Sequence, residues 1–169
     1  MGYFQLRNLT VLVVDDDADT SALICDLLDA LGFGKCLAAA NGEVAKTILG
    51  DPRTIPVDLV ITDFAMEPGD GAELLQWIRR DPDSPDRFVP VVLMTGLTDM
   101  DALVRMRDLG VSEVLAKPIS LDSLCNLIDG LIAKPRRFVE SGRYFGPDRR
   151  RREIPYRGGE RRHLVEEPS

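Results

Sequence analysis

Short apolar runs alternate five times with stretches of helical periodicity over residues 1–133. Several of the runs are rich in β-branched residues, as strands covered on both faces are. Between them, leucine and isoleucine recur at the three- and four-residue spacing of amphipathic helices. Strands that alternate with helices build parallel sheets from βαβ units. The pattern predicts an α/β fold with a doubly wound five-stranded parallel sheet, whose strands lie at residues 9–14, 36–39, 57–62, 89–94 and 111–116.

Four of these runs end at side chains that can carry chemistry. Asp15 and Asp16 follow the first run, Asp63 the third, Thr95 the fourth and Lys117 the fifth. The carboxyl ends of parallel strands meet along one edge of an open sheet, so we expect these side chains to lie close together. Three carboxylates, a hydroxyl and an ammonium at one edge suit Mg²⁺ and a phosphoryl group.

Each of these residues alone also has an ordinary structural reading. Aspartate is favoured at helix N-termini, so Asp15, Asp16 and Asp17 could simply cap the first helix. Three aspartates in succession exceed what one cap uses, and Asp17 and Asp19 are the better cap candidates. The combination of strand ends therefore favours a site, from which Asp17 and Asp19 are left out.

The charge of the chain is unevenly placed. Residues 1–133 carry 10 Lys and Arg against 22 Asp and Glu, whereas residues 134–169 carry 11 against 6. Helical periodicity also stops after Ala133, and the rest contains four prolines and an arginine run at 149–152. We expect a domain at 1–133 and a basic Pro/Gly/Arg-rich tail at 134–169 that is too short for an ordinary output domain.

The three cysteines, Cys25, Cys36 and Cys125, are an odd number at wide spacings in apolar surroundings. This pattern fits neither a disulfide framework nor a zinc site, so buried thiols in a reducing cytosol are expected. The first residues lack the pattern of a signal peptide, and no segment reaches the length of about 18 apolar residues that a membrane span needs. We expect a cytoplasmic protein.

Five fragments in order carry a resemblance to a known family. They are Val13-Val14-Asp15-Asp16-Asp17, then residues 58–66 (DLVITDFAM), Asp70-Gly71, residues 92–96 (VLMTG) and Lys117-Pro118. Each fragment alone is weak, but with this order and spacing residues 9–132 resemble a response-regulator receiver domain of two-component signalling. The resemblance implies a flavodoxin-like (βα)5 fold and a cis peptide bond before Pro118.

The resemblance also implies roles for the residues at the strand ends. Asp63 is the expected phosphoacceptor and nucleophile, with Thr95 and Lys117 binding phosphoryl oxygens. Mg²⁺ is the expected cofactor, and its expected protein ligands are the side chains of Asp15, Asp16 and Asp63 and the backbone carbonyl of Ala65. The phosphoryl group would come from a sensor histidine kinase or a histidine phosphotransfer protein, because the one histidine, His163, lies in the tail. Such a protein is no turnover enzyme.

One departure from the family pattern leaves a second function open. The family usually has an aromatic switch residue three positions before the lysine, where this chain has Val114. The main hypothesis is a single-domain response regulator that signals to a downstream protein, with a homodimer possible and DNA binding not expected. The alternative is a phosphorylation-independent binding module on a receiver scaffold, whose tail contacts protein or nucleic acid.

The tail has several readings that the sequence does not separate. Its arginines are interleaved with Phe138, Tyr144, Phe145 and Tyr156, a mixture that can bind RNA, anionic lipid or a protein partner. It could instead be a disordered solubilising segment. A further reading is that residues 144–147 fold back on the acidic receiver or on a second copy of it, as the opposite charges allow.

Overall fold

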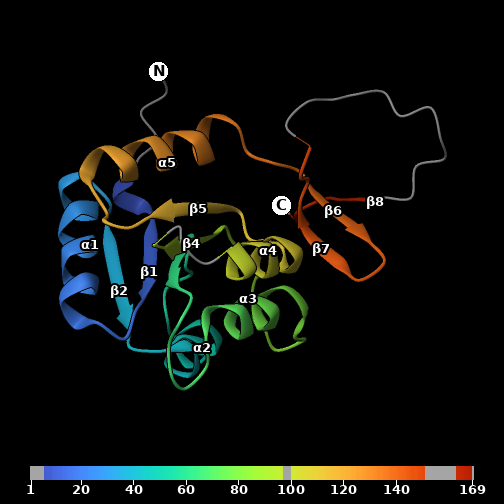
Figure 1. Cartoon of the computed structure of the whole chain (residues 1–169), viewed down its shortest axis with the longest axis horizontal. Helices are drawn as coiled ribbons and strands as arrows, with labels where there is room; N and C mark the ends of the chain where they lie inside the picture. Colours follow the sequence, from blue (N-terminus) through green and yellow to red (C-terminus); the bar gives the residue numbers. More distant parts are fainter. Residues whose placement is uncertain (1–5, 97–99, 151–162, 169) are drawn as a thin grey trace.

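The computed structural model describes residues 6–96, 100–150 and 163–168. Five strands and five helices alternate along the first part of the chain, and three further strands follow (Figure 1). The elements are η1 (Leu6–Asn8), β1 (Thr10–Val14), α1 (Ala18–Ala30), β2 (Lys35–Ala39), α2 (Gly42–Gly50), β3 (Leu59–Asp63), α3 (Gly71–Arg80), β4 (Val91–Thr95), α4 (Met100–Leu109), β5 (Glu113–Ala116), α5 (Leu121–Ala133), β6 (Phe138–Ser141), β7 (Tyr144–Pro147) and β8 (His163–Val165).

The first five strands form one parallel sheet in the order β2-β1-β3-β4-β5. The chain winds outward from β1 in both directions, which places helices on both faces of the sheet. The predicted doubly wound, flavodoxin-like sheet is therefore confirmed, with strand boundaries within two residues of the expected ones. None of the helices in the described part of the chain is long and apolar enough to cross a membrane.

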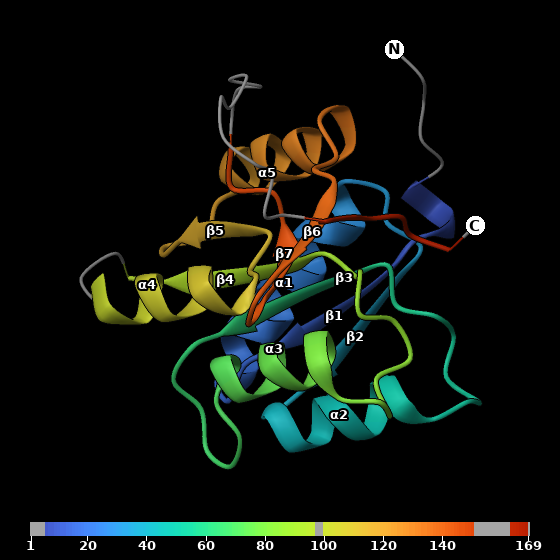
Figure 2. The same ribbon diagram turned by 90° about the vertical axis from the view of Figure 1, so that its right-hand side faces the viewer.

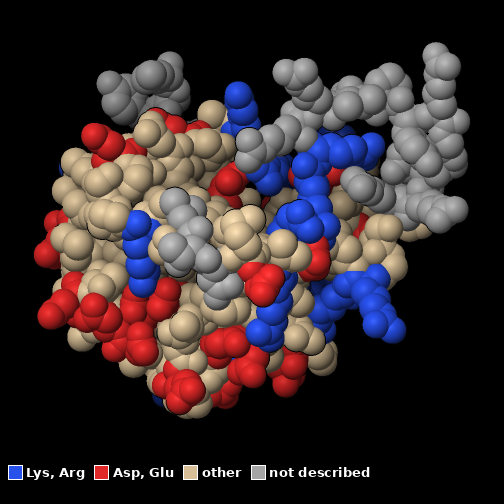
Figure 3. All heavy atoms as spheres, in the orientation of Figure 1, with Lys and Arg blue, Asp and Glu red and all other residues tan. Residues whose placement is uncertain are grey.

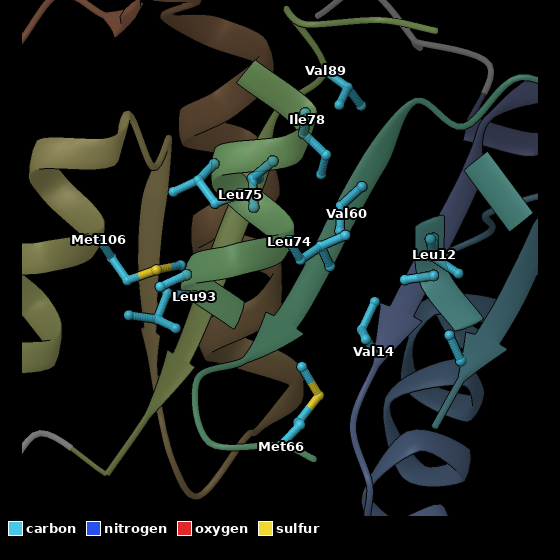
Figure 4. Close-up of a cluster of buried hydrophobic side chains, with 14 residues drawn as sticks. Leu12, Val14, Val60, Met66, Leu74, Leu75, Ile78, Val89, Leu93 and Met106 are labelled. Atoms are coloured by element: carbon cyan, nitrogen blue, oxygen red, sulfur yellow. The ribbon is translucent and has the colours of Figure 1, made fainter. Parts of the chain in front are cut away.

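Two hydrophobic clusters hold the layers together. Side chains of α2, α3 and α4 pack on one face of the sheet, and those of α1 and α5 pack on the other. Figure 2 shows these layers, with α5 above the strands and α2 and α3 below them. In the first cluster, Leu74 and Leu75 of α3 and Met106 of α4 lie against Val60 and Leu93 of the sheet (Figure 4). Successive residues of a buried strand face opposite layers, so the apolar runs of β1, β3 and β4 supply both clusters.

Cys25 and Cys36 form a disulfide that joins α1 to β2, with Cα atoms 5.6 Å apart. The expectation of three thiols is wrong for this pair. Both residues pack against the same hydrophobic cluster, and this closeness arises from the packing of a helix on a strand, which sequence spacing does not reveal. Cys125 is a free, partly buried thiol.

The tail contains a three-stranded antiparallel sheet in the order β7-β6-β8. β7 contacts α3 and α4, and Figure 1 shows the β6–β7 hairpin beside the end of α4. Of the readings left open for the tail, the structure shows residues 144–147 folded back on the rest of the chain. The contact is built on buried aromatic side chains, because Phe145 is 1% exposed and its ring lies 5.4 Å from that of Phe88.

Candidate functional site

The carboxyl ends of β1 and β3 bring three carboxylates together. The two strands are neighbours, and Val14 lies opposite Thr62 in their register, so the residues that follow these two lie side by side. One carboxylate oxygen each of Asp15, Asp16 and Asp63 lie within 4.8 Å of one another. The structure thus gathers the three acidic side chains that the sequence analysis placed at this edge.

Lys117 reaches the same cluster from the end of β5. Its Nζ lies 3.1 Å from Oδ1 of Asp63 and 3.6 Å from Oδ2 of Asp15. The backbone N–H of Lys117 donates to the carbonyl of Thr95 at 2.8 Å, which holds the ends of β4 and β5 together. The peptide bond before Pro118 is cis, as the resemblance implied.

The pKa values of Lys117 and Asp15 reflect this crowding. Burial lowers the pKa of the Lys117 ammonium, but the hydrogen bond and the charge of Asp63, together with the charge of Asp15, raise it above its ordinary value. Burial raises the pKa of the Asp15 carboxyl, and the charges of Asp63 and Asp16 add to that effect. The N–H of Asp17 and the charge of Lys117 oppose the rise without cancelling it.

Asp15 has the features expected of a metal ligand. Its side chain is 1% exposed, and one oxygen, Oδ1, accepts a hydrogen bond from the N–H of Asp17 at 2.9 Å. The other oxygen, Oδ2, is buried and has no hydrogen-bond partner among the described residues. A buried carboxylate oxygen that accepts no hydrogen bond, with the Lys117 ammonium 3.6 Å away and two further carboxylates beside it, fits a hard divalent cation that takes oxygen ligands.

Thr95 and Ala65 lie on two different segments at this edge. Thr95 is the last residue of β4 and is 7% exposed. Ala65 lies two residues after Asp63, exposed in the loop before α3. The roles assigned to these two residues, a hydroxyl donor to phosphoryl and a carbonyl ligand to the metal, stay predictions.

The loop between β3 and α3 is fixed by close backbone contacts. The N–H of Gly71 donates to the carbonyl of Phe64 at 2.8 Å, and a Cβ on Gly71 would lie 2.4 Å from the carbonyl oxygen of Asp63. The N–H of Gly42 donates to the carbonyl of Gly69, which ties the same loop to the start of α2. The backbone around Asp63 is therefore held in place by close contacts of Gly71 and Gly42. The sequence alone does not reveal these contacts.

Asp70 has two roles that sequence reasoning missed. Its Oδ1 accepts a hydrogen bond from the N–H of Glu73 at 2.7 Å and so caps α3. Its Oδ2 lies 3.6 Å from Nη1 of Arg105 on α4. The loop that follows Asp63 is therefore connected to α4. An aspartate before a glycine at a helix start was a signal for the cap, but nothing in the sequence pointed to Arg105.

The site has the parts that a transfer of a phosphoryl group needs. The carboxylate of Asp63 is partly exposed and can act as a nucleophile, while Lys117 supplies a positive charge beside it. Carboxylates of Asp15 and Asp16 can hold a divalent cation next to the same atom. The arrangement can therefore support formation of an acyl phosphate on Asp63.

Comparisons with known proteins agree with this geometry. The family model described as "Response regulator receiver domain" matches residues 11–129. A probable chemotaxis protein CheY of Rhizobium etli is 32% identical over 125 residues, which are 74% of this chain and 93% of that protein. The phosphate regulon transcriptional regulatory protein PhoB of Pseudomonas aeruginosa is 28% identical over 66% of this chain, and the match spans 46% of PhoB.

The fold is similar to that of solved structures of the same kind. A putative response regulator from Chloroflexus aurantiacus has a TM-score of 0.65 and 25% identity, and the match covers 75% of this chain and 98% of that one. The family model ends at residue 129, before the tail begins.

Proposed function

Because the chain belongs to the response regulator receiver domain family, we propose that Asp63 accepts a phosphoryl group from a histidine of a partner kinase or phosphotransfer protein. One observation carries this proposal. The Asp63 carboxylate lies 3.1 Å from the Lys117 ammonium and within 4.8 Å of the carboxylates of Asp15 and Asp16. No other side chain in the cluster combines partial exposure with both kinds of partner.

In the proposed reaction, a carboxylate oxygen of Asp63 attacks the phosphorus of a phosphohistidine. A P–O bond forms as the P–N bond breaks, and the leaving imidazole nitrogen keeps the electron pair and takes a proton. Mg²⁺, when bound, offsets the negative charge of the transferring group. Asp15, Asp16 and the Ala65 carbonyl would hold the metal together with Asp63 itself.

After the transfer, Lys117 and Thr95 would bind the phosphoryl group. The ammonium of Lys117 would exchange part of its contact with Asp63 for a phosphoryl oxygen. The hydroxyl of Thr95 would donate to another oxygen and draw the end of β4 toward the site. A change of charge at one atom would then become a change of surface that a partner protein can recognise.

The alternative, a binding module that works without phosphorylation, is favoured by one observation. Val114 lies on β5 and is 37% exposed, and an aliphatic side chain there cannot act as the aromatic switch of the family. The buried Oδ2 of Asp15 argues for a working metal site instead, since it has no hydrogen-bond donor and the Lys117 ammonium 3.6 Å away offsets the charge only in part.

Intact mass after incubation with acetyl phosphate and Mg²⁺ tests the proposal. We expect the wild type to gain about 80 Da, the mass of one phosphoryl group, and Asp63→Asn to gain nothing. Asp29→Asn, an isosteric change at an exposed position of α1, serves as the matched control and should gain the same mass as the wild type.

An unmodified wild type, measured beside a receiver known to react, would favour the phosphorylation-independent module. A mass gain that persists in Asp63→Asn would place the acceptor at another residue.

A further inference from the structure

α4 extends from the acceptor site toward the tail sheet. It begins at Met100, five residues after Thr95, and ends at Leu109, directly before Gly110, where the tail makes contact (Figure 1). A helix of ten residues is about 15 Å long. Because a helix moves largely as a rigid body, a displacement at one end of α4 is felt at the other.

The middle of α4 is connected to the loop that follows the acceptor residue. Arg105 lies 3.6 Å from the Asp70 carboxylate, and Asp70 caps α3 at the end of that loop. Met106, one residue further along, is fully buried in the cluster beneath the sheet (Figure 4). α4 is therefore linked, through Asp70, to the loop that follows Asp63.

The far end of α4 is held by the tail. Arg149 donates from Nη2 to the carbonyl of Arg107 at 3.1 Å, and its Nη1 lies 3.2 Å from Oδ1 of Asp108. A cation suits the C-terminal end of a helix, where backbone carbonyls lack partners within the helix. The guanidinium of Arg149 also lies 4.2 Å from the ring centroid of Tyr144 in β7.

At the C-terminal end of α4, the backbone packs directly against the backbone of β7. A Cβ on Gly110 would lie 2.4 Å from the carbonyl oxygen of Phe145, and a Cβ on Gly146 would lie 2.6 Å from Cα of Gly110. The two segments thus touch through bare backbone. Close-packed contacts of this kind do not stretch, so a shift of α4 relative to β7 has to break them.

The tail sheet is also anchored to parts of the chain that do not belong to α4. Phe138 and Phe145 pack edge-on or tilted against each other and against Phe88, which precedes β4. Arg136 forms an ion pair with Glu113 at the start of β5. Because these contacts hold the tail to other parts of the chain, the tail cannot move together with α4 when α4 shifts.

We propose that the tail sheet, β6, β7 and β8, is a phosphorylation-controlled element that is docked on the end of α4 in the unmodified protein and loosened when Asp63 carries a phosphoryl group. This inference rests on the function proposed above. Movement of the Thr95 end of β4 toward the phosphoryl group displaces α4, and the contacts of Gly110 and Arg149 with the tail are lost. By linkage, docking of the tail in turn disfavours the phosphorylated arrangement.

Hydrogen exchange of the full-length chain tests the inference. The wild type is treated with acetyl phosphate and Mg²⁺, its phosphorylation is read by intact mass, and exchange is followed in peptides that cover residues 138–147. We expect exchange to rise about tenfold in the phosphorylated wild type, because local opening governs it, and to stay unchanged in Asp63→Asn under the same treatment.

Phe145→Ala calibrates the measurement, since loss of the central buried ring undocks the sheet and gives the exchange rate of a released tail. Exchange that stays at the docked rate in a wild type shown by mass to be phosphorylated would overturn this inference and leave the proposed function standing. A wild type that gains no mass would overturn the proposed function, and this inference with it.

Discussion

At the scale of single residues, the buried carboxylate of Asp15 lowers the stability of the folded, metal-free protein. A carboxylate that is almost fully buried, has one oxygen without a hydrogen-bond partner and lies beside two more carboxylates is less favourable when ionised than it would be in water. Burial is the main reason that its pKa is raised, and the charge of Lys117 offsets only part of the effect. The metal-free protein therefore carries a local cost that a bound cation would remove.

Asp15→Asn should accordingly stabilise the metal-free protein. We expect the melting temperature to rise by about 2–4 °C near neutral pH in the presence of a chelator, which corresponds to about 1 kcal/mol. An acid whose pKa is raised on folding costs stability above that pKa, and the cost disappears as the pH falls through it. The advantage of Asn should therefore shrink as the pH is lowered toward 4, as thermal unfolding followed by circular dichroism can show.

Asp16→Asn is the control for this experiment. Asp16 is exposed, so its negative charge destabilises the folded protein less than that of Asp15, and its replacement should raise the melting temperature less. Saturating Mg²⁺ should narrow the difference between the wild type and Asp15→Asn, since the cation stabilises only the folded form that has all its ligands. A melting temperature of Asp15→Asn that lies below that of the wild type in chelator would contradict the argument.

The residues of the acceptor site were largely predictable, and the reason is topological. A parallel sheet places every strand end at one edge, so Asp15, Asp63 and Lys117 could be brought together without any knowledge of side-chain packing. Asp70 with Arg105 was not predictable in this way. That pair depends on how two helices on the same face pack, and the sequence fixes neither their rotation nor their distance.

At the scale of elements, the contact between α4 and β7 depends on Gly110. Its φ is +94°, a region that side chains with a Cβ rarely adopt, and its missing Cβ leaves room for the carbonyl of Phe145. The carbonyl of Gly110 in turn accepts a hydrogen bond from Nε of the buried Arg79 at 3.1 Å. Gly110 thus follows the end of α4, leaves room for β7 and accepts a hydrogen bond from the buried Arg79.

Gly110→Ala should lower the free energy of unfolding by about 2–3 kcal/mol, because a strained backbone and a clash with a main-chain atom add up. Denaturant unfolding followed by the fluorescence of Trp77 measures this change. Gly130→Ala is the matched control: Gly130 lies within α5 with no atom near its missing Cβ, and alanine should raise helix stability by up to about 1 kcal/mol there. Equal effects of the two substitutions would contradict the close contact.

The strands of the tail could not be predicted from sequence patterns. The five central strands were recognisable because each contains a short apolar run next to turn residues, and β1, β3 and β4 are buried on both faces. β6 and β7 are four residues each, and their buried residues, among them Val139 and Phe145, do not form a long apolar run. Their partner Phe88 lies about 50 residues earlier in the chain, so no local pattern announces the contact.

At the scale of the whole molecule, the uneven distribution of charge is not what holds the tail sheet in place. On the face shown in Figure 3, Asp and Glu gather toward the lower left, whereas Lys and Arg gather on the right, where Figure 1 places β6 and β7. The opposite charges suggested an electrostatic contact, and ion pairs do occur at Glu113 and Asp108. These pairs are partly exposed, however, and such pairs contribute about 0–1 kcal/mol each.

Tail docking should therefore withstand salt. We expect the hydrogen exchange of residues 138–147 in the unmodified wild type to change less than about threefold between low salt and 1 M NaCl, where charges are screened beyond about 3 Å. The aromatic cluster is insensitive to screening, so it keeps the sheet in place. Exchange at 1 M NaCl that reached the rate of Phe145→Ala would show instead that charge holds the tail.

The acceptor site and the tail sheet lie at opposite edges of the same parallel sheet: Asp63 and Thr95 end their strands, whereas Glu113 begins β5 and Phe88 precedes β4. Under the proposed function, a phosphodonor protein that reaches Asp63 would contact the edge where β3 and β4 end, and the tail sheet at the other edge would stay outside that contact.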